Sequence, residues 1–220
     1  MERILLIGAT GGIGSALCAT LGARGCEVIP RSRSVDGFDV TDEASVIQGL
    51  EAIGDLDGVI VASGALEIDG AVPEKTIRTL SPKAMADQFA LNAIGPALIL
   101  KHAHRLLRRD ARSVFAVLSA RVGSIGDNLL GGWVSYRAAK AAVNQIVHTS
   151  AIELARSHPQ AICVALHPGT VKTAFTEKYL GRHPAVEPAD AAQNILQVID
   201  GLTPAQTGQF FDWRGQEVPW

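Results

Sequence analysis

Short apolar runs alternate with longer segments of helical periodicity along the whole 220-residue chain. Runs such as "RILLIG" and "SVFAVLS" are apolar at nearly every position, which is typical of strands buried on both faces of a parallel sheet. The pattern predicts strands over 3–8, 26–30, 58–63, 113–119, 161–168 and 208–213, and helices over 12–24, 42–53, 83–109, 133–157 and 188–201. This alternation predicts an α/β fold of the Rossmann type: a doubly wound parallel sheet with helices on both faces, in a single domain over 1–220.

The composition gives no reason to expect a strongly charged or membranous partner. With a formal net charge of −2, neither nucleic acid nor an anionic membrane is expected to bind. No apolar run reaches the ~18 residues needed to span a bilayer, and the N-terminus lacks the layout of a signal peptide. The three cysteines and six histidines show no metal-binding spacing. We therefore expect a cytoplasmic protein without a metal site.

Four glycines, Gly8, Gly11, Gly12 and Gly14, lie between the first strand and the first helix. Glycines at this point permit a tight turn and a close approach of the backbone, and the N-terminus of the helix then faces the phosphates of a dinucleotide. The spacing fits both G-x-x-x-G-x-G and G-x-x-G-x-x-G. The motif therefore predicts a dinucleotide but leaves open the branch of the fold.

The end of the second strand indicates which dinucleotide is bound. An NAD enzyme presents an acid there to the ribose 2′-hydroxyl, whereas this chain reads "VIPRSRS". The guanidinium groups of Arg31 and Arg33 suit a 2′-phosphate instead. We therefore predict NADP(H) in preference to NAD(H).

Tyr136 and Lys140 lie one turn apart on the predicted helix 133–157. At 100° per residue they share a stripe with Val143 and Val147, so both are expected to face the core. A buried Lys is costly unless its charge is used, and an ammonium beside a Tyr lowers the pKa of the phenol. Tyr136 is thus a candidate general acid/base for a carbonyl/alcohol pair. A Tyr and a Lys at this spacing often occur by chance. The pair indicates a catalytic site here because a nucleotide-binding motif precedes it in the chain.

Several further segments occur together with these motifs in a recognisable order. They are "GATGGIG", "FDVTD", "VASG", "LNAIG", "SYRAAKAAVN" and "HPGTVKT". Over essentially its whole length the chain resembles the short-chain dehydrogenase/reductase family. "LSARVGSI", "PEKTI" and the ending "FFDWRG…VPW" are similar to the C-factor-like, sniffer-type carbonyl-reductase branch. The resemblance implies an oxidoreductase that transfers hydride between a nicotinamide and a carbonyl or alcohol substrate.

The resemblance also implies roles for individual residues. Tyr136 would exchange the substrate proton, Lys140 would lower the pKa of Tyr136 and hold the nicotinamide ribose, and Asn92 would hold a water in the proton relay. Asp39 would contact the adenine, and the segment from Pro168 would line the nicotinamide and phosphates. The predicted cofactor-binding residues are Gly8, Thr10, Gly11, Gly12, Ile13, Gly14, Arg31, Arg33, Asp39, Val40, Ala62, Ser63, Gly64, Tyr136, Lys140, Pro168, Gly169, Val171 and Thr173.

Two features depart from the family pattern. The family's N-N-A-G is "VASG" here, so the side-chain contacts of its asparagines are missing. The catalytic serine is also ambiguous. Alignment on Gly123 puts Ala120 at its position, whereas alignment on the end of the strand puts Ser119 there. Ser124, twelve residues before Tyr136, is the second candidate, and we predict Ser119 ahead of Ser124.

Two classes of function remain open. The first is an NADP(H)-dependent carbonyl reductase, and the second is a nucleotide-binding regulatory or signalling protein with little turnover. Small and apolar residues on a second side of helix 133–157, such as Ala142 and Ile146, predict a homodimer or homotetramer through that helix. The irregular stretches 65–82 and 172–187 are expected to form the walls of the substrate site. They do not identify the substrate.

Overall fold

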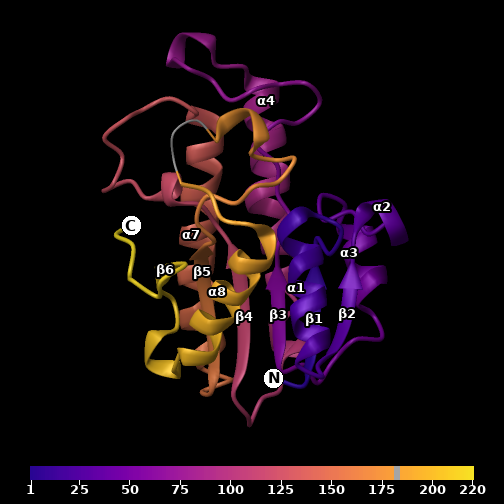
Figure 1. Ribbon diagram of the computed structural model, residues 1–220. Coiled ribbons are helices and arrows are strands. Elements are labelled where there is room, and N and C mark those ends of the chain that lie inside the picture. The colour runs from indigo at the N-terminus through magenta and orange to yellow at the C-terminus, as the bar shows by residue number, and fades with distance from the viewer. Residues whose placement is uncertain (181–183) are drawn as a thin grey trace.

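A parallel sheet forms the centre of the computed structural model, which describes residues 1–180 and 184–220 (Figure 1). Its strands are β1 (Arg3–Ile7), β2 (Glu27–Arg31), β3 (Gly58–Val61), β4 (Ser113–Leu118), β5 (Ala161–His167) and β6 (Phe210–Asp212). Their order is β2-β1-β3-β4-β5-β6, and every neighbouring pair is parallel. The strand order reverses between β1 and β3, the point at which such sheets bind ligands.

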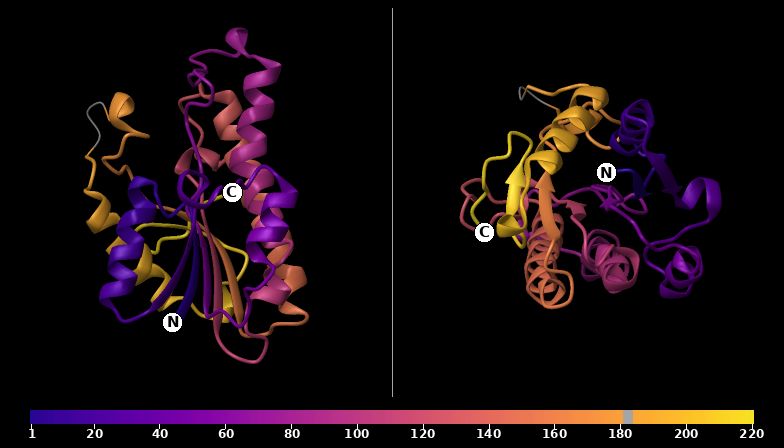
Figure 2. Two further views of the ribbon diagram at one scale, coloured as in Figure 1. Left: turned by 90° about the vertical axis from the view of Figure 1, so that its right-hand side faces the viewer. Right: turned by 90° about the horizontal axis from the view of Figure 1, so that it is seen from below.

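Helices cover both faces of this sheet (Figure 2). Those of the described residues are α1 (Gly12–Ala23), α2 (Arg33–Asp36), α3 (Glu43–Leu50), α4 (Pro82–Phe89), α5 (Gly95–Leu100), α6 (Ala103–Leu106), α7 (Val134–Ala155) and α8 (Pro188–Gly201), with 3₁₀ turns at Ile77–Thr79, Arg121–Gly123, Glu177–Tyr179 and Pro204–Gln206. Helices α1 and α8 pack together on one face. Helices α3, α5, α6 and α7 pack on the other. The predicted doubly wound α/β fold is confirmed.

The apolar strands supply a separate core to each helical layer. All six residues of β4 are buried, and their side chains alternate between the two faces. Phe115 packs in the cluster that includes α7, whereas Val114 and Ala116 pack in the cluster that includes α1 and α8. Continuous apolar runs are therefore required here, because neither face of the central strands meets solvent.

The predicted helix 83–109 is wrong as one continuous element. The chain forms α4, a π-helical turn over Ala90–Ile94, then α5 and α6. The π turn carries Asn92, whose fully buried side chain bonds to Ala65 and Gln88. π turns of this kind commonly occur at functional sites. The short helix α2, with the sequence "RSVD", was not predicted, because a single turn has no detectable periodicity.

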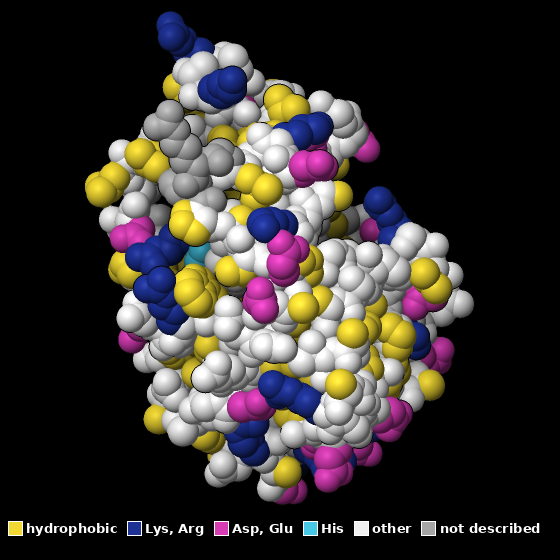
Figure 3. All heavy atoms as spheres, in the orientation of Figure 1, with side chains coloured by type: hydrophobic (Ala, Val, Ile, Leu, Met, Phe, Trp, Pro, Cys, Tyr) yellow, Lys and Arg dark blue, Asp and Glu magenta, His cyan; other side chains and the backbone are white. Residues whose placement is uncertain are grey.

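The loops that follow the strands gather at one end of the sheet, at the top of Figure 1. They include the predicted walls, apart from residues 181–183, which lie outside the described residues. Acidic and basic side chains are interspersed on the face drawn in Figure 3. Within residues 1–180 and 184–220, no helix is long and apolar enough to cross a membrane.

Candidate active site

The glycine-rich turn is shaped by contacts that leave no room for side chains. Gly8 has a φ of 83°, and a Cβ there would lie 2.6 Å from the amide nitrogen of Ser63. A Cβ on Gly14 would lie 2.0 Å from the carbonyl oxygen of Gly8. Gly11 caps α1 without any side-chain hydrogen bond, so the first amides of the helix are available to an anion. This cradle fits the pyrophosphate of a dinucleotide.

Segments far apart in sequence meet at this turn. A Cβ on Gly12 would lie 2.5 Å from Cγ2 of Thr173, which follows β5. Gly169, with a φ of 83°, approaches the ring of Trp213. Pro168 and Gly169 are half-buried and Val171 is buried. Ser63 follows β3, and its buried hydroxyl has no hydrogen-bond partner among the described residues. The structure thus brings together the turn, the end of β3 and the 168–173 segment.

The two arginines at the end of β2 and the start of α2 differ in their surroundings. Arg31, the last residue of β2, donates from Nε to the carbonyl of Gly49 at 3.2 Å, and its NH1 lies 3.7 Å from Asp36. Arg33 is exposed at the start of α2. The Thr10 hydroxyl is 3.0 Å from that of Ser34 and connects the glycine-rich turn to α2. Of the two arginines, Arg33 is thus the more exposed, and its neighbour Ser34 contacts the turn.

The predicted adenine-side residues, Asp39 and Val40, lie between α2 and α3. The hydroxyl and amide of Thr41 donate to the Asp39 carboxylate at 2.7 and 2.9 Å. These hydrogen bonds lower the pKa of Asp39. Val40 is buried, and a Cβ on Gly95 would lie 2.8 Å from its Cγ2. The Asp39 carboxylate therefore stabilises its own turn.

Tyr136 and Lys140 are both buried in the first half of α7, with 6% and 3% of their surfaces exposed. Nζ of Lys140 donates to the carbonyl of Leu118 at 2.9 Å and lies 5.8 Å from the centre of the Tyr136 ring. A Cβ on Gly64 would lie 3.7 Å from that Nζ and 2.8 Å from Oδ1 of Asn92. The structure therefore brings Tyr136, Lys140 and Asn92 together beside Gly64.

Burial dominates the protonation of this pair. It lowers the pKa of Lys140 to about 8 and raises the pKa of Tyr136 above its ordinary value. The direction for Tyr136 is opposite to that expected from a neighbouring ammonium, because burial of the phenol raises its pKa. The Lys140 ammonium itself is hydrogen-bonded to the Leu118 carbonyl. At neutral pH Tyr136 is protonated and Lys140 is mostly charged. Tyr136 can thus act as an acid.

Asn92 holds the chain that follows Gly64. Its Nδ2 donates to the carbonyl of Ala65 at 2.9 Å and to Oε1 of Gln88 at 2.7 Å, and its Oδ1 accepts from the amide of Ala65 at 3.3 Å. Gln88 in turn donates to the carbonyl of Leu66. This network fixes the start of the 65–82 wall against the π turn.

The two candidate serines are engaged elsewhere. Ser119 donates to Oδ1 of Asn144 at 2.6 Å, and Asn144 lies two turns beyond Tyr136 on α7, about 12 Å along its axis. The Ser124 hydroxyl donates to the carbonyl of Pro219 and accepts from the amide of Asp127. In the described chain neither serine is hydrogen-bonded to Tyr136. The choice between them stays a prediction.

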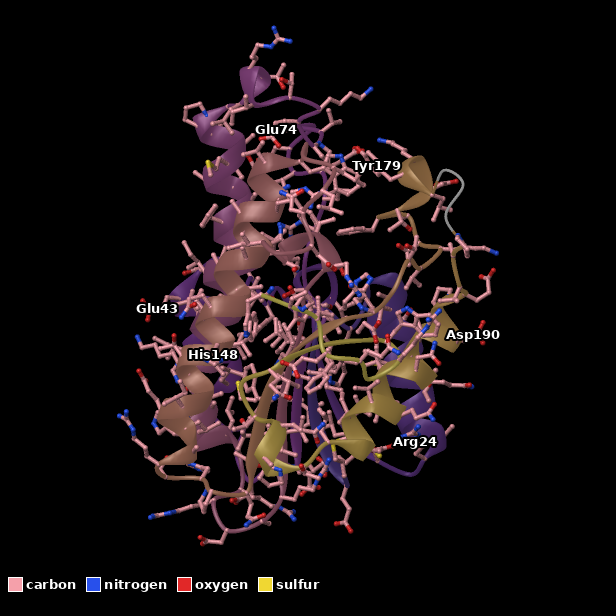
Figure 4. The ribbon with its side chains drawn as sticks, turned by 90° about the vertical axis from the view of Figure 1, so that its left-hand side faces the viewer. Arg24, Glu43, Glu74, His148, Tyr179 and Asp190 are labelled. Atoms are coloured by element: carbon pink, nitrogen blue, oxygen red, sulfur yellow. The ribbon has the colours of Figure 1, made fainter. Side chains whose placement is uncertain are left out.

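Two aromatic residues lie near Tyr136, and a third packs against one of them. Its ring centre is 6.4 Å from those of Trp133 and Phe175, and Trp133 is 5.5 Å from Tyr179. The Tyr179 hydroxyl donates to Glu67 at 2.7 Å, which joins the two predicted walls. Figure 4 shows Tyr179 opposite the N-terminal end of α7. The lengths of the irregular stretches indicated a wall here, but no sequence pattern identified Phe175 or Tyr179.

Comparisons with known proteins agree with this arrangement. The family model described as short chain dehydrogenase matches residues 2–182. A 1-hydroxy-2-glutathionyl-2-methyl-3-butene dehydrogenase of Rhodococcus is 29% identical over 236 aligned residues, which cover all of both chains. The C-signal of Myxococcus xanthus is 39% identical over 138 residues, or 62% of this chain and 78% of that protein.

Among solved structures, an NADPH-bound carbonyl reductase from chicken fatty liver is 25% identical with a TM-score of 0.81. The match covers 100% of this chain and 99% of that one. The order of the strands, the glycine cradle and the buried Tyr–Lys pair thus coincide with a family match over most of the sequence. The chain belongs to the short-chain dehydrogenase family of oxidoreductases.

Proposed function

We propose that the protein is an NADP(H)-dependent carbonyl reductase in which Tyr136 is the general acid/base. The observation that carries this proposal is the burial of Tyr136 and Lys140 beside Gly64 and Asn92, at the carboxyl end of the sheet. The NADPH-bound carbonyl reductase with the same fold supports it.

The roles of the residues follow from their positions. The amides at the start of α1 would bind the pyrophosphate, and Lys140 would hold the nicotinamide ribose. When bound, the nicotinamide supplies a hydride to the carbonyl carbon. Tyr136 donates its proton to the carbonyl oxygen. It is then reprotonated from the side on which Lys140 and Asn92 lie. The oxidation of an alcohol runs the same steps in reverse.

The preference for NADP(H) rests on Arg33. Arg33 is exposed and precedes Ser34, whose hydroxyl lies 3.0 Å from that of Thr10 in the glycine-rich turn, whereas Arg31 is already bonded to Gly49 and lies near Asp36. Replacing Arg33 by Ala is expected to raise the Kd for NADPH by about tenfold, the value of one charge-assisted contact, and to leave the Kd for NADH unchanged. Equal effects on both nucleotides, measured by fluorescence titration, would contradict this assignment.

Turnover tests the proposal directly. NADPH oxidation is followed over a panel of aldehydes and ketones with the wild type and with Tyr136→Phe. We expect the variant to lose at least about a hundredfold in kcat while binding NADPH normally, because only the proton donor is removed. Retained activity in Tyr136→Phe would refute the assignment. Ser119 is proposed ahead of Ser124 as the hydroxyl that polarises the carbonyl, and Ser119→Ala with unchanged kcat would reverse that order.

A signalling role without turnover is the second candidate. The C-signal of Myxococcus xanthus is 39% identical over the matched region, and the two candidate serines are engaged away from Tyr136. Tight NADPH binding together with no turnover on any carbonyl of the panel would favour this role.

We further propose that the protein assembles as a homodimer or homotetramer through α7. Ala142 and Ile146 on that helix are only partly buried, and Ile152 is 52% exposed. A second copy covering the exposed side of this helix would remove apolar surface from water.

A further inference from the structure

The helix that carries Tyr136 begins in a strained conformation. Gly131, Gly132 and Trp133 all have positive φ, with values of 64°, 69° and 52°. Trp133 is the N-cap of α7, where its own side chain makes no capping hydrogen bond. A non-glycine residue in the left-handed region costs about 1–3 kcal/mol and persists only where its surroundings hold it. Something outside the helix must therefore fix this start.

Glu74 provides that restraint from the opposite wall. Its main-chain carbonyl accepts from the amide of Trp133. Its carboxylate accepts from the amide of Ser135 at 3.3 Å and from the Ser135 hydroxyl. Figure 4 shows Glu74 at the N-terminal end of α7. One residue, 61 positions away in sequence from Ser135, thus holds both the N-cap and the second residue of the helix.

The setting of the Glu74 carboxylate indicates a specific role. Only 8% of the residue is exposed, and within the described residues it forms no ion pair. A buried carboxylate without a cation is costly, but the N-terminus of α7 offers unpaired amides and a favourable dipole. Side chains usually cap their own helix, whereas α7 takes its cap from a wall of the site.

The residues that Glu74 holds are those that set the position of Tyr136. Ser135 immediately precedes Tyr136, and the Trp133 ring packs edge-on against the Tyr136 ring. Glu74, Ser135 and Tyr136 also line one narrow cavity together with Gln88, which bonds to Asn92. We propose that Glu74 is a positioning residue for Tyr136: it fixes the first turn of α7 so that the phenol meets the substrate carbonyl. This inference rests on the proposed function.

The test compares Glu74→Ala, Glu74→Gln and Ser135→Ala with the wild type. Glu74→Ala is expected to lower kcat at least about tenfold while the Kd for NADPH stays within about twofold, because misplacement of an acid affects the chemical step. Glu74→Gln restores most of kcat, since its amide oxygen still accepts from Ser135. Adding Ser135→Ala to Glu74→Ala causes little further loss, because the two changes remove one interaction.

Thr203→Ala is the control. Thr203 precedes the 3₁₀ turn Pro204–Gln206, outside both walls, and its exposed hydroxyl donates to Oε1 of Gln206 at 3.1 Å. Removing this exposed hydrogen bond is expected to lower Tm slightly and leave kcat unchanged. A Glu74→Ala enzyme with a lower Tm but wild-type kcat would overturn the proposal. If Glu74→Ala does not fold, Ser135→Ala is measured in its place. A wild-type kcat in Ser135→Ala then refutes the positioning role of Glu74.

Amide hydrogen exchange separates this inference from the proposed function. The amides of residues 133–137 are expected to exchange faster in Glu74→Ala than in the wild type and Glu74→Gln, whether or not any carbonyl is reduced. Unchanged exchange in Glu74→Ala overturns the positioning role. Absence of turnover in the wild type, with faster exchange in Glu74→Ala, refutes the carbonyl-reductase proposal alone.

Discussion

The two sides of the candidate active site are built by different means. On the side proposed to bind the cofactor (the cofactor side), between β1 and β3, the surface is mostly backbone: Gly8 and Gly14 each have a backbone atom within 2.6 Å of where a Cβ would be. On the substrate side, the surface is made by side chains from separate loops, such as Glu67, Trp133 and Tyr179.

This difference predicts where the chain tolerates amino-acid substitutions. Backbone atoms cannot move away from a new side chain without shifting a strand or helix, so the cofactor side is expected to respond abruptly. Side-chain contacts between loops can be removed one at a time, and each is worth about 1 kcal/mol. The substrate side should therefore respond in graded steps, and the following changes test that contrast.

Gly14→Ala is expected to have the largest effect. A Cβ there would lie 2.0 Å from the Gly8 carbonyl oxygen and 3.1 Å from Cα of Ala9, both of which are backbone atoms. The start of α1 must shift, at a cost of about 3 kcal/mol or more in the free energy of unfolding. We expect NADPH binding, measured by fluorescence titration, to fall below detection.

Gly22→Ala is the control on the same helix, because a Cβ at Gly22 meets nothing within 4 Å. It should raise stability by about 0.5–1 kcal/mol, since Ala favours a helix over Gly, and leave NADPH binding intact. If both variants bind NADPH equally, the cofactor side is not the rigid surface described above.

Lys140→Met tests the residue at the junction of the two sides. Burial lowers the pKa of Lys140 from 10.5 to about 8, so the charged form destabilises the folded protein. We expect loss of turnover together with greater stability at pH 7. The gain is on the order of 2 kcal/mol after the lost hydrogen bond to Leu118, or a Tm higher by about 5 °C.

The pH dependence of this gain has a definite sign. Below pH 8 both the folded and the unfolded states carry the proton, and the whole cost of burying the charge is present. Between about 8 and 10.5 the unfolded state binds more protons, so the wild type gains stability as the pH rises. The advantage of Lys140→Met should therefore shrink over that range in thermal melts. A gain that grows with pH would contradict the burial argument.

The position of the glycine-rich turn and the proximity of Tyr136 to Lys140 could be predicted because their signals are local. Gly8 and Gly14 lie in one short stretch, and Tyr136 and Lys140 are one helical turn apart. Apolar runs likewise identified each strand of the sheet. These features depend on periodicity and on the conformational freedom of glycine, both of which are visible without knowing what lies opposite.

The substrate side, which is made by side chains from separate loops, could not be predicted in the same way. The contact between Glu67 and Tyr179 joins residues 112 positions apart. The π turn within the helix predicted over 83–109 carries Asn92, which bonds to Ala65, 27 positions away. The hydrogen bond of Ser119 to Asn144, on another element, is a further contact of this kind. Such tertiary contacts override local pattern and leave no periodic signal.

Tyr179→Phe is expected to have the smallest effect. It removes the 2.7 Å hydrogen bond to Glu67 and keeps the ring against Trp133. The loss is worth about 1 kcal/mol, so KM for an apolar ketone should rise about fivefold with kcat nearly unchanged. Lys178→Met is the matched control, because Lys178 pairs with the same carboxylate at 2.8 Å but its side chain is 72% exposed. Exposed ion pairs contribute little, so steady-state kinetics should show no change there. If Lys178→Met raises KM as much as Tyr179→Phe, the two walls are joined through charge, and the substrate side is more sensitive to salt than its buried contacts imply.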